Sequence, residues 1–412
     1  MLKGLNFRMP AEWEPHEATW LGWPHELTDW PSKFAPIPWA FAEIVRHLTR
    51  VERVNLLVET HAARSRVKAI LRKSGADLNA ITFFDVPTDR GWMRDSGPIG
   101  VVTSDQPERP VVPLRDENAK QISRSALFPP EDRRDDHAQD GTALLNFGFN
   151  GWAKYDDYKK DAKVAARLAS EIDGRPRSKQ VRRARSIVTL RGKSAAAANA
   201  KNPSSVILPM HRGRHVVLEG GSIDVNGRGT LLTTEECLLS GVQERNPGFT
   251  RDDYAEVFRR YLGVTNVLWL HKGIAGDDTH GHVDDLARFV NASTVVTAFA
   301  DDSADANYEP LAENLALLRS MKDQDGNALR VETLPMPEAV VFDGQRLPAS
   351  YANFYIANKI VLVPTFNDPA DRIALDKLAA LFPDRAIRPV YCRDLVLGLG
   401  TIHCMTQQLP SP

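Results

Sequence analysis

The densest group of chemically active side chains is the ten-residue stretch Gly276-Asp277-Asp278-Thr279-His280-Gly281-His282-Val283-Asp284-Asp285. If His280 to Asp284 is extended, then His280, His282 and Asp284 point to one side of a strand, because side chains alternate along an extended chain. Such a group could bind zinc. It could instead move protons, with His282 as general acid and base and Asp284 as a charge partner or substrate clamp. A solvated loop with turn-capping side chains is the structural alternative.

Two further carboxylates lie beside glycines. Asp95, in Trp92-Met-Arg-Asp-Ser-Gly-Pro98, suits a turn before a predicted strand at Ile99 to Thr103. Asp95 could cap that turn, pair with Arg94 or act in a functional site. The spacing of the residues does not distinguish between these roles. Glu219 ends an apolar strand in Leu218-Glu-Gly-Gly-Ser222. The two glycines there allow a close approach of the backbone to another group.

The chain has three cysteines, too few for a disulfide framework. Cys404 follows the glycine-containing segment Gly398-Leu-Gly-Thr-Ile-His403, and a thiolate there could attack carbon. Cys237 follows two glutamates, which would raise the pKa of its thiol, so we interpret it as structural. Cys392 lies beside Arg393 without a glycine-rich approach. Spacing alone leaves an inert, buried role open for all three.

The elements that must position these residues recur along the chain. About three strand–strand–helix–strand units follow one another at a spacing of about 65 residues. Units of this kind are expected to pack against one another, so that their loops converge on one place. The predicted strands are Ser222–Val225, Gly229–Thr233, Asn266–Leu270, Leu286–Val290, Thr294–Phe299, Arg330–Leu334, Ala352–Ile356, Ile360–Val363 and Ile387–Val390, and the predicted helices are Arg251–Tyr261, Leu311–Met321 and Arg372–Phe382.

The first half carries a weaker form of this pattern. Pro38–Thr49 has the apolar period of a helix, Val54–Val58 reads as a buried strand, and a helix near Ala62–Lys73 ends before Gly75. Two polar or basic stretches, at about 104–141 and 176–203, interrupt the pattern and are interpreted as insertions. The basic stretch could contact an acidic partner, although charge runs are usually solvated surface.

The composition indicates a globular protein. The chain has 412 residues, 42% of them hydrophobic and 25% charged, and a formal net charge of −1. Such a balance gives no reason to expect a nucleic acid or a membrane surface as a partner. The first ten residues lack the apolar core of a secretory signal, and no apolar run approaches a bilayer's thickness. We therefore expect a cytoplasmic protein.

Seven blocks, in order, resemble the agmatine deiminase branch of the guanidine-modifying (pentein) superfamily, which includes the bacterial-type peptidylarginine deiminases. The blocks span nearly the whole chain. They are Met9-Pro-Ala-Glu-Trp-Glu-Pro-His-Glu-Ala-Thr-Trp20, Trp92-Met-Arg-Asp-Ser-Gly-Pro98, Phe149-Asn-Gly-Trp152, Leu218-Glu-Gly-Gly-Ser-Ile223, Gly276-Asp-Asp-Thr-His-Gly-His-Val-Asp-Asp285, Pro348-Ala-Ser-Tyr-Ala-Asn-Phe-Tyr355 and Ile402-His-Cys-Met-Thr-Gln-Gln408.

The resemblance implies a single α/β catalytic domain spanning 1–412, a propeller of five ββαβ units around a pseudo-fivefold axis. It implies that no metal or other cofactor is used. The implied reaction converts agmatine to N-carbamoylputrescine and ammonia, a step of polyamine synthesis, through an amidino group held on the cysteine. The implied roles are Cys404 as nucleophile, His282 as general acid and base, Asp95 and Asp284 as the guanidinium clamp, Glu219 as the remaining catalytic carboxylate, and Trp92 and His280 as further substrate contacts.

The chain departs from the family pattern at two places. His280 stands where many members have aspartate, and Leu399 interrupts a run that is often all glycine. These changes leave deiminase chemistry intact and leave the non-guanidine end of the substrate open. Deimination of free or peptidyl arginine, amidino transfer and a non-catalytic binding protein remain alternatives. The expected partner is a small guanidine, and the chain could form a homo-oligomer.

Overall fold

The computed structural model describes residues 6–104, 141–174 and 206–412. The two predicted insertions, at about 104–141 and 176–203, lie outside the described residues apart from residues 104 and 141. Within the described ranges, every helix is too short or too polar to cross a bilayer.

Five sheets among the described residues combine an antiparallel strand pair with a parallel pair. Each strand predicted for the repeat pattern is present at least in part, although the one predicted at Ala352–Ile356 is reduced to Tyr355–Ile356. The sheets, in strand order, are β1 (Asn6–Arg8), β5 (Ile99–Ser104), β6 (Thr142–Leu145) and β7 (Val206–Ile207); β10 (Asp224–Val225), β11 (Thr230–Thr234) and β12 (Asn266–Leu270); β13 (Ala287–Asn291), β14 (Thr294–Phe299) and β15 (Arg330–Pro335); β18 (Tyr355–Ile356), β19 (Ile360–Thr365) and β20 (Ala386–Tyr391); and β21 (Thr406–Pro410), β2 (His16–Gly22), β3 (Arg53–Val58) and β4 (Ile81–Asp85).

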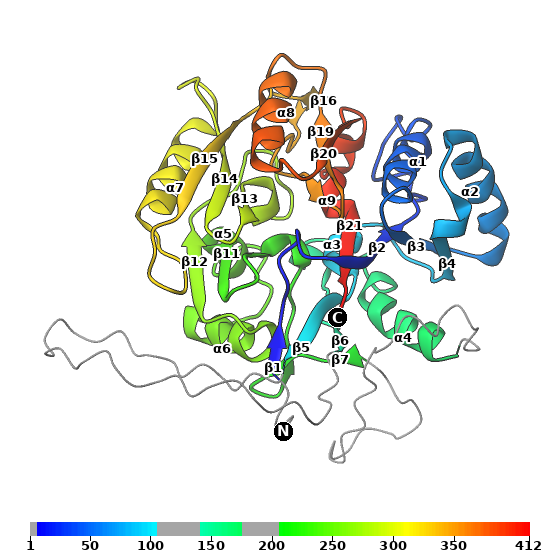
Figure 1. The fold of residues 1–412 in the computed structure, drawn as a ribbon, viewed down its shortest axis with the longest axis horizontal. Coiled ribbons are helices and arrows are strands. Elements are labelled where there is room, and N and C mark those ends of the chain that lie inside the picture. Colours follow the sequence, from blue (N-terminus) through cyan, green and yellow to red (C-terminus); the bar gives the residue numbers. More distant parts are fainter. Residues whose placement is uncertain (1–5, 105–140, 175–205) are drawn as a thin grey trace, which may run out of the picture.

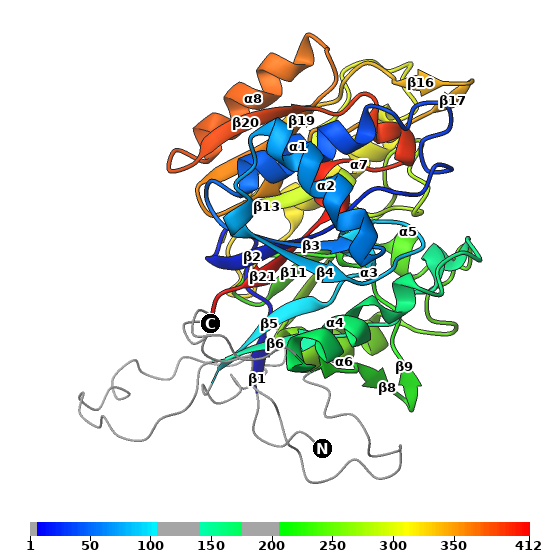
Figure 2. The same cartoon turned by 90° about the vertical axis from the view of Figure 1, so that its right-hand side faces the viewer.

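Each parallel pair is joined by a helix, as parallel strands require a crossover. Figures 1 and 2 show these helices at the outside of the molecule, with the strands toward its middle. The helices predicted from the sequence are confirmed, with ends that differ by at most three residues. The crossover helices are α1 (Ile37–Leu48), α2 (His61–Ser74), α4 (Val164–Gly174), α6 (Arg251–Leu262), α7 (Tyr308–Ser320) and α8 (Ala370–Leu381).

Local sequence signals explain where these helices begin and end. Helix α6 starts at a capping box, in which Thr250 accepts from the Asp253 backbone and Asp253 accepts from the Thr250 backbone. It ends at Gly263 with φ of 70°, and α2 ends at Gly75 with φ of 79°. Left-handed backbone of this kind is tolerated best by glycine.

Short helical turns carry the candidate site, and Figure 1 shows α3, α5 and α9 in the middle of the molecule. The contacts between α3 and α9, α3 and η5, and η5 and η6 bring together four segments far apart in sequence. The last strand, β21, pairs antiparallel with β2 and so fixes the turn before it. These turns are α3 (Met93–Ser96), η5 (Gly220–Ser222), α5 (Glu235–Leu238), η6 (Val283–Asp285) and α9 (Ile402–Met405).

The first arm of the predicted hairpin at Ser222 is shorter than expected. Gly220–Ser222 forms the 3-10 turn η5, so the strand begins only at Asp224. Two smaller hairpins, β8 (Met210–His211) with β9 (Arg214–His215) and β16 (Val341–Phe342) with β17 (Gln345–Arg346), were not predicted.

Candidate active site

The double glycine at 220–221 allows Asp95 and His282 to approach the same piece of backbone. The Gly221 amide donates to Asp95 Oδ1 at 3.1 Å. A β-carbon at Gly221 would lie 2.5 Å from His282 Nδ1 and 2.9 Å from Asp95 Oδ1. These spacings are too short for any side chain larger than glycine. The close approach expected from the sequence is therefore confirmed, and the group approached is the Asp95–His282 pair.

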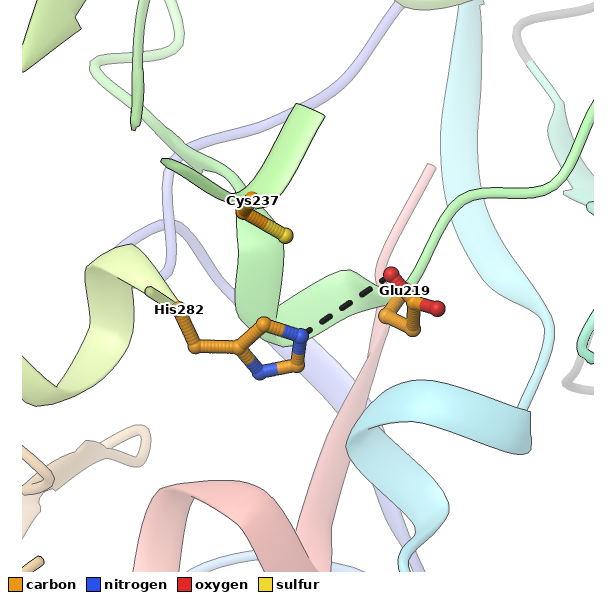
Figure 3. Close-up of side chains that lie close together, drawn as sticks. All are labelled: Glu219, Cys237 and His282. Carbon is orange, nitrogen blue, oxygen red and sulfur yellow. Dashed lines mark ion pairs between the residues drawn. The ribbon is translucent and has the colours of Figure 1, made fainter. Parts of the chain in front are cut away.

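His282 is buried among three carboxylates. Its Nδ1 atom lies 3.9 Å from Asp95 Oδ1 and 3.9 Å from Asp284 Oδ1, whereas its Nε2 atom lies 3.9 Å from Glu219 Oε2. Figure 3 shows the Glu219 carboxylate on the Nε2 side of the ring. Within the described part of the chain, neither ring nitrogen of His282 has a hydrogen-bond partner. The ring therefore has two distinct sides: Nδ1 faces Asp95 and Asp284, and Nε2 faces Glu219.

Cys404 faces the same place from α9. Its thiol accepts a hydrogen bond from Asn353 Nδ2 at 3.0 Å and lies 3.7 Å from Asp284 Oδ2. Gly400 makes room for it, because a β-carbon there would meet Cys404 Sγ at 3.1 Å and Trp92 Cζ3 at 3.0 Å. The five residues expected to be catalytic therefore converge, and Trp92 packs at the edge of the loop that carries Cys404.

Trp152 was not singled out by sequence reasoning as a site residue. It adopts a positive φ of 56°, and its indole Nε1 donates to Asp95 Oδ2 at 2.9 Å. With the Gly221 amide on Oδ1, both oxygens of Asp95 are held in place. The family block at residues 149–152 was the available signal.

A buried ion network behind the site also escaped sequence reasoning. His403 Nδ1 lies 2.6 Å from Asp284 Oδ2, and His403 Nε2 lies 2.8 Å from Glu12 Oε2. Glu12 in turn pairs with Arg94 at 3.1 Å and with Arg288 at 3.0 Å. The network fixes one oxygen of Asp284 and leaves the other, Oδ1, facing His282 without a hydrogen-bond partner in the described residues.

Glu219 is held in place by Arg245. Both of its oxygens accept from Arg245 Nε, at 3.1 and 3.3 Å, and both side chains are buried. Burial alone would raise the pKa of Glu219, but the Arg245 charge and contact with His282 outweigh it and lower the pKa to about 2. Glu219 is therefore a permanent anion beside the imidazole.

The pKa values of Asp95, His282 and Cys404 are shifted because these groups are buried close to several carboxyl groups. Burial raises the pKa of Asp95 to about 6, although the neighbouring His282 opposes the shift. Burial alone would lower the pKa of His282, but Asp95, Cys237 and Glu219 raise it well above its usual value. Burial, followed by the charges of Asp284 and Asp285, raises the pKa of Cys404 well above that of a free thiol. Without a bound cation, the site holds an imidazolium and a neutral thiol.

The expected extended conformation of His280 to Asp284 is wrong. His280 has a left-handed φ of 65°, and the following Val283–Asp285 segment is the 3-10 turn η6. The His280 ring consequently contacts Ser240 Oγ at 3.2 Å and lies 4.0 Å from Glu236, away from Asp284. The three side chains do not share one face, and a substrate contact by His280 stays a prediction.

The alternative zinc set of His280, His282 and Asp284 is not formed. Two other buried groups in the described ranges have metal-ligand types within 4.8 Å of one another: Glu219, Cys237 and His282, and Asp284, Asp285 and Cys404. In the first group, Arg245 already contacts both oxygens of Glu219. In the second, the Asn353 amide contacts both Asp285 and Cys404.

Comparison with known proteins agrees with this geometry. Residues 8–410 match the family of Porphyromonas-type peptidyl-arginine deiminases. Agmatine deiminases of Stutzerimonas stutzeri and Pseudomonas aeruginosa are each 31% identical, over 99% of this chain and 96% of theirs. A solved agmatine deiminase of Enterococcus faecalis has a TM-score of 0.75 and 27% identity, covering 100% of this chain and 99% of that one. The chain belongs to the Porphyromonas-type peptidyl-arginine deiminase family, among its agmatine deiminases.

Proposed function

We propose that this chain hydrolyses agmatine to N-carbamoylputrescine and ammonia, with Cys404 as the nucleophile. The observation that carries the proposal is the convergence of Cys404, His282, Asp95, Asp284 and Glu219 in one buried place. The agmatine deiminases that align with almost the whole chain support the choice of substrate.

Asp95 and Asp284 would bind the guanidinium. A guanidinium is planar, cationic and rich in N–H donors, so two fixed carboxylates can hold its plane and orient its carbon. Asp95 is fixed by Trp152 and the Gly221 amide, and Asp284 by His403. The side chain of Cys404 lies 3.7 Å from Asp284, so a guanidinium bound there would present its carbon to the sulfur.

The substrate itself would activate the nucleophile. Asp284 and Asp95, two of the carboxylates that raise the pKa of Cys404, are the groups that a guanidinium would neutralise. Substrate binding therefore lowers the pKa of the thiol and favours the thiolate. The Asn353 amide, which contacts Cys404 Sγ at 3.0 Å, further stabilises the anion.

His282 would then act twice. The thiolate forms a bond to the guanidinium carbon, the imidazolium protonates the departing amine, and ammonia leaves. An S-alkylthiouronium intermediate remains on Cys404. The now neutral His282 accepts a proton from water, the hydroxide attacks the same carbon, and the C–S bond breaks to give the ureido product. Glu219, held anionic by Arg245, stabilises the imidazolium that is present before the first proton transfer and again after the second.

We also propose that the five mixed sheets are the five ββαβ units of one propeller, which forms a single catalytic domain. Their shared strand pattern and the contacts among the short turns at their centre support this arrangement. The family likeness extends from residue 8 to residue 410, which supports one domain rather than two.

Ammonia release from a panel of guanidines tests the function. The panel contains agmatine, free arginine, a blocked arginyl peptide and simple guanidines, with Cys404→Ala as the control. We expect release from agmatine with kcat/KM at least about 100-fold above that for arginine, because the relatives that align with almost the whole chain are agmatine deiminases. Chromatography of the product is expected to show N-carbamoylputrescine.

Two results would contradict the proposal. Release from the arginyl peptide alone would keep the mechanism but move the substrate to peptidyl arginine, the substrate class in the family's own name. No release from any guanidine would contradict deimination itself, despite the assembled side chains.

A further inference from the structure

Cys237 lies on the side of the His282 ring opposite the proposed guanidinium clamp. Its sulfur, a Glu219 carboxylate oxygen and a His282 ring nitrogen all lie within 4.8 Å of one another. Figure 3 shows the sulfur directed toward the ring nitrogen that also faces Glu219, which is Nε2. Nδ1 faces Asp95 and Asp284 instead. A residue interpreted from the sequence as structural thus contacts the proposed proton shuttle.

The position of Cys237 is tied to that of His282 by backbone. Thr234 caps the single turn of α5 by accepting from the Cys237 amide at 3.1 Å. The same Thr234 hydroxyl donates to the carbonyl of Gly281, the residue just before His282. Glu236, next to Cys237, accepts from the Gly273 amide at 2.7 Å. These hydrogen bonds therefore fix the position of the Cys237 thiol relative to the His282 imidazole.

Glu219 does not by itself provide a hydrogen-bond partner for His282 Nε2. Its nearest oxygen is 3.9 Å from Nε2, longer than a hydrogen bond, and both of its oxygens already accept from Arg245. Cys237 is 1% exposed and Glu219 fully buried, so this side of the ring is closed to solvent. Sulfur is a weak acceptor and a soft contact, which suits a ring that must be charged in one step and neutral in the next.

We propose that Cys237 is a positioning residue for His282, which keeps the ring protonated at Nε2 and shielded from water there, so that proton transfer to and from the substrate occurs at Nδ1. The inference rests on the proposed function of His282 as general acid and base. It assigns Cys237 a role in the reaction in place of the structural role expected from the sequence.

Kinetics of Cys237→Ala test this role. We expect kcat to fall about 10-fold with KM changed less than about 2-fold, because the clamp carboxylates are untouched and only proton transfer suffers. Cys237→Ser, whose hydroxyl oxygen can also accept from Nε2–H, is expected to recover part of the loss. The matched control is Cys392→Ala, since Cys392 is an equally buried cysteine outside the site.

The pH profile separates positioning from packing. The groups that face His282 are Asp95 and Asp284 at Nδ1, Glu219 with its partner Arg245 at Nε2, and Asp277, which accepts from the His282 amide. Cys237 is one of the contacts that raise the pKa of His282. Its loss lowers that pKa, so the alkaline limb of kcat, where the imidazolium is lost, moves to lower pH in Cys237→Ala.

A lower melting temperature in Cys237→Ala with unchanged kcat and pH profile would overturn the proposal, because Cys237 would then only pack. NMR titration of the His282 ring, assigned with His282→Gln, keeps the test independent of agmatine turnover. We expect a lower imidazole pKa in Cys237→Ala than in the wild type. Equal values would overturn the proposal even if agmatine is the substrate.

Discussion

Cys404→Ala is expected to lower kcat for ammonia release from agmatine by about 10⁴-fold or more, to the background of the assay. The guanidinium carbon is a poor electrophile, and no other described side chain in the site offers a comparable nucleophile at this position. Cys404→Ser should be nearly as inactive, because a hydroxyl ionises far less readily than a thiol. The assay is coupled ammonia detection under saturating agmatine.

Measuring agmatine binding to Cys404→Ala shows whether the loss of activity comes from the missing nucleophile or from a damaged binding site. Cys404→Ala keeps Asp95 and Asp284, whose positions are fixed by Trp152 and His403 rather than by the thiol. Calorimetry should therefore show agmatine binding to Cys404→Ala with a Kd near the wild-type KM. Full turnover by Cys404→Ser would contradict covalent catalysis, and absent binding by Cys404→Ala would show that the substitution damaged the site.

His282→Gln is expected to lower kcat by about 10²- to 10⁴-fold, the range of general acid–base catalysis. Glutamine retains polar atoms in the buried position but cannot protonate the leaving amine or accept a proton from water. Binding should change little, because Asp95 and Asp284 hold the guanidinium in this account. The measurement is steady-state kcat and KM for agmatine.

His271→Gln is the matched control for His282→Gln. The His271 side chain is 46% exposed and lies 3.7 Å from Glu313, outside the site. Its kinetics should equal those of the wild type. If His282→Gln retained wild-type kcat as well, His282 would not be the proton shuttle and the role inferred for Cys237 would fail with it.

Elements that depend on local signals could be predicted from the sequence. Thr250, Asp253 and Gly263 define helix α6 through interactions within one turn of its ends, so neighbouring residues are sufficient information. The hairpin at the Asn226-Gly227 turn is confirmed for the same reason. The convergence of Asp95, Glu219, His282 and Cys404 came from the family resemblance, because no local pattern places four distant segments together.

The parts that escaped prediction depend on contacts between distant segments. His403 meets Glu12 from the opposite end of the chain, 391 residues away. Cys237 reads as an unremarkable cysteine after two glutamates, yet α5 directs its sulfur at His282 while Glu236 turns to the Gly273 amide. The alternating pattern at 280–284 would suit a strand, but His280 has a positive φ and residues 283–285 form a 3-10 turn instead.

Acid quenching during turnover, followed by peptide mass spectrometry, tests the central claim most directly. In the proposed mechanism, the peptide that contains Cys404 gains the mass of agmatine less ammonia, and this adduct decays as N-carbamoylputrescine appears. Cys404→Ala should show no adduct on any peptide. Ammonia release without an adduct, or an adduct on Cys237 instead of Cys404, would contradict the assignment of Cys404 as the nucleophile.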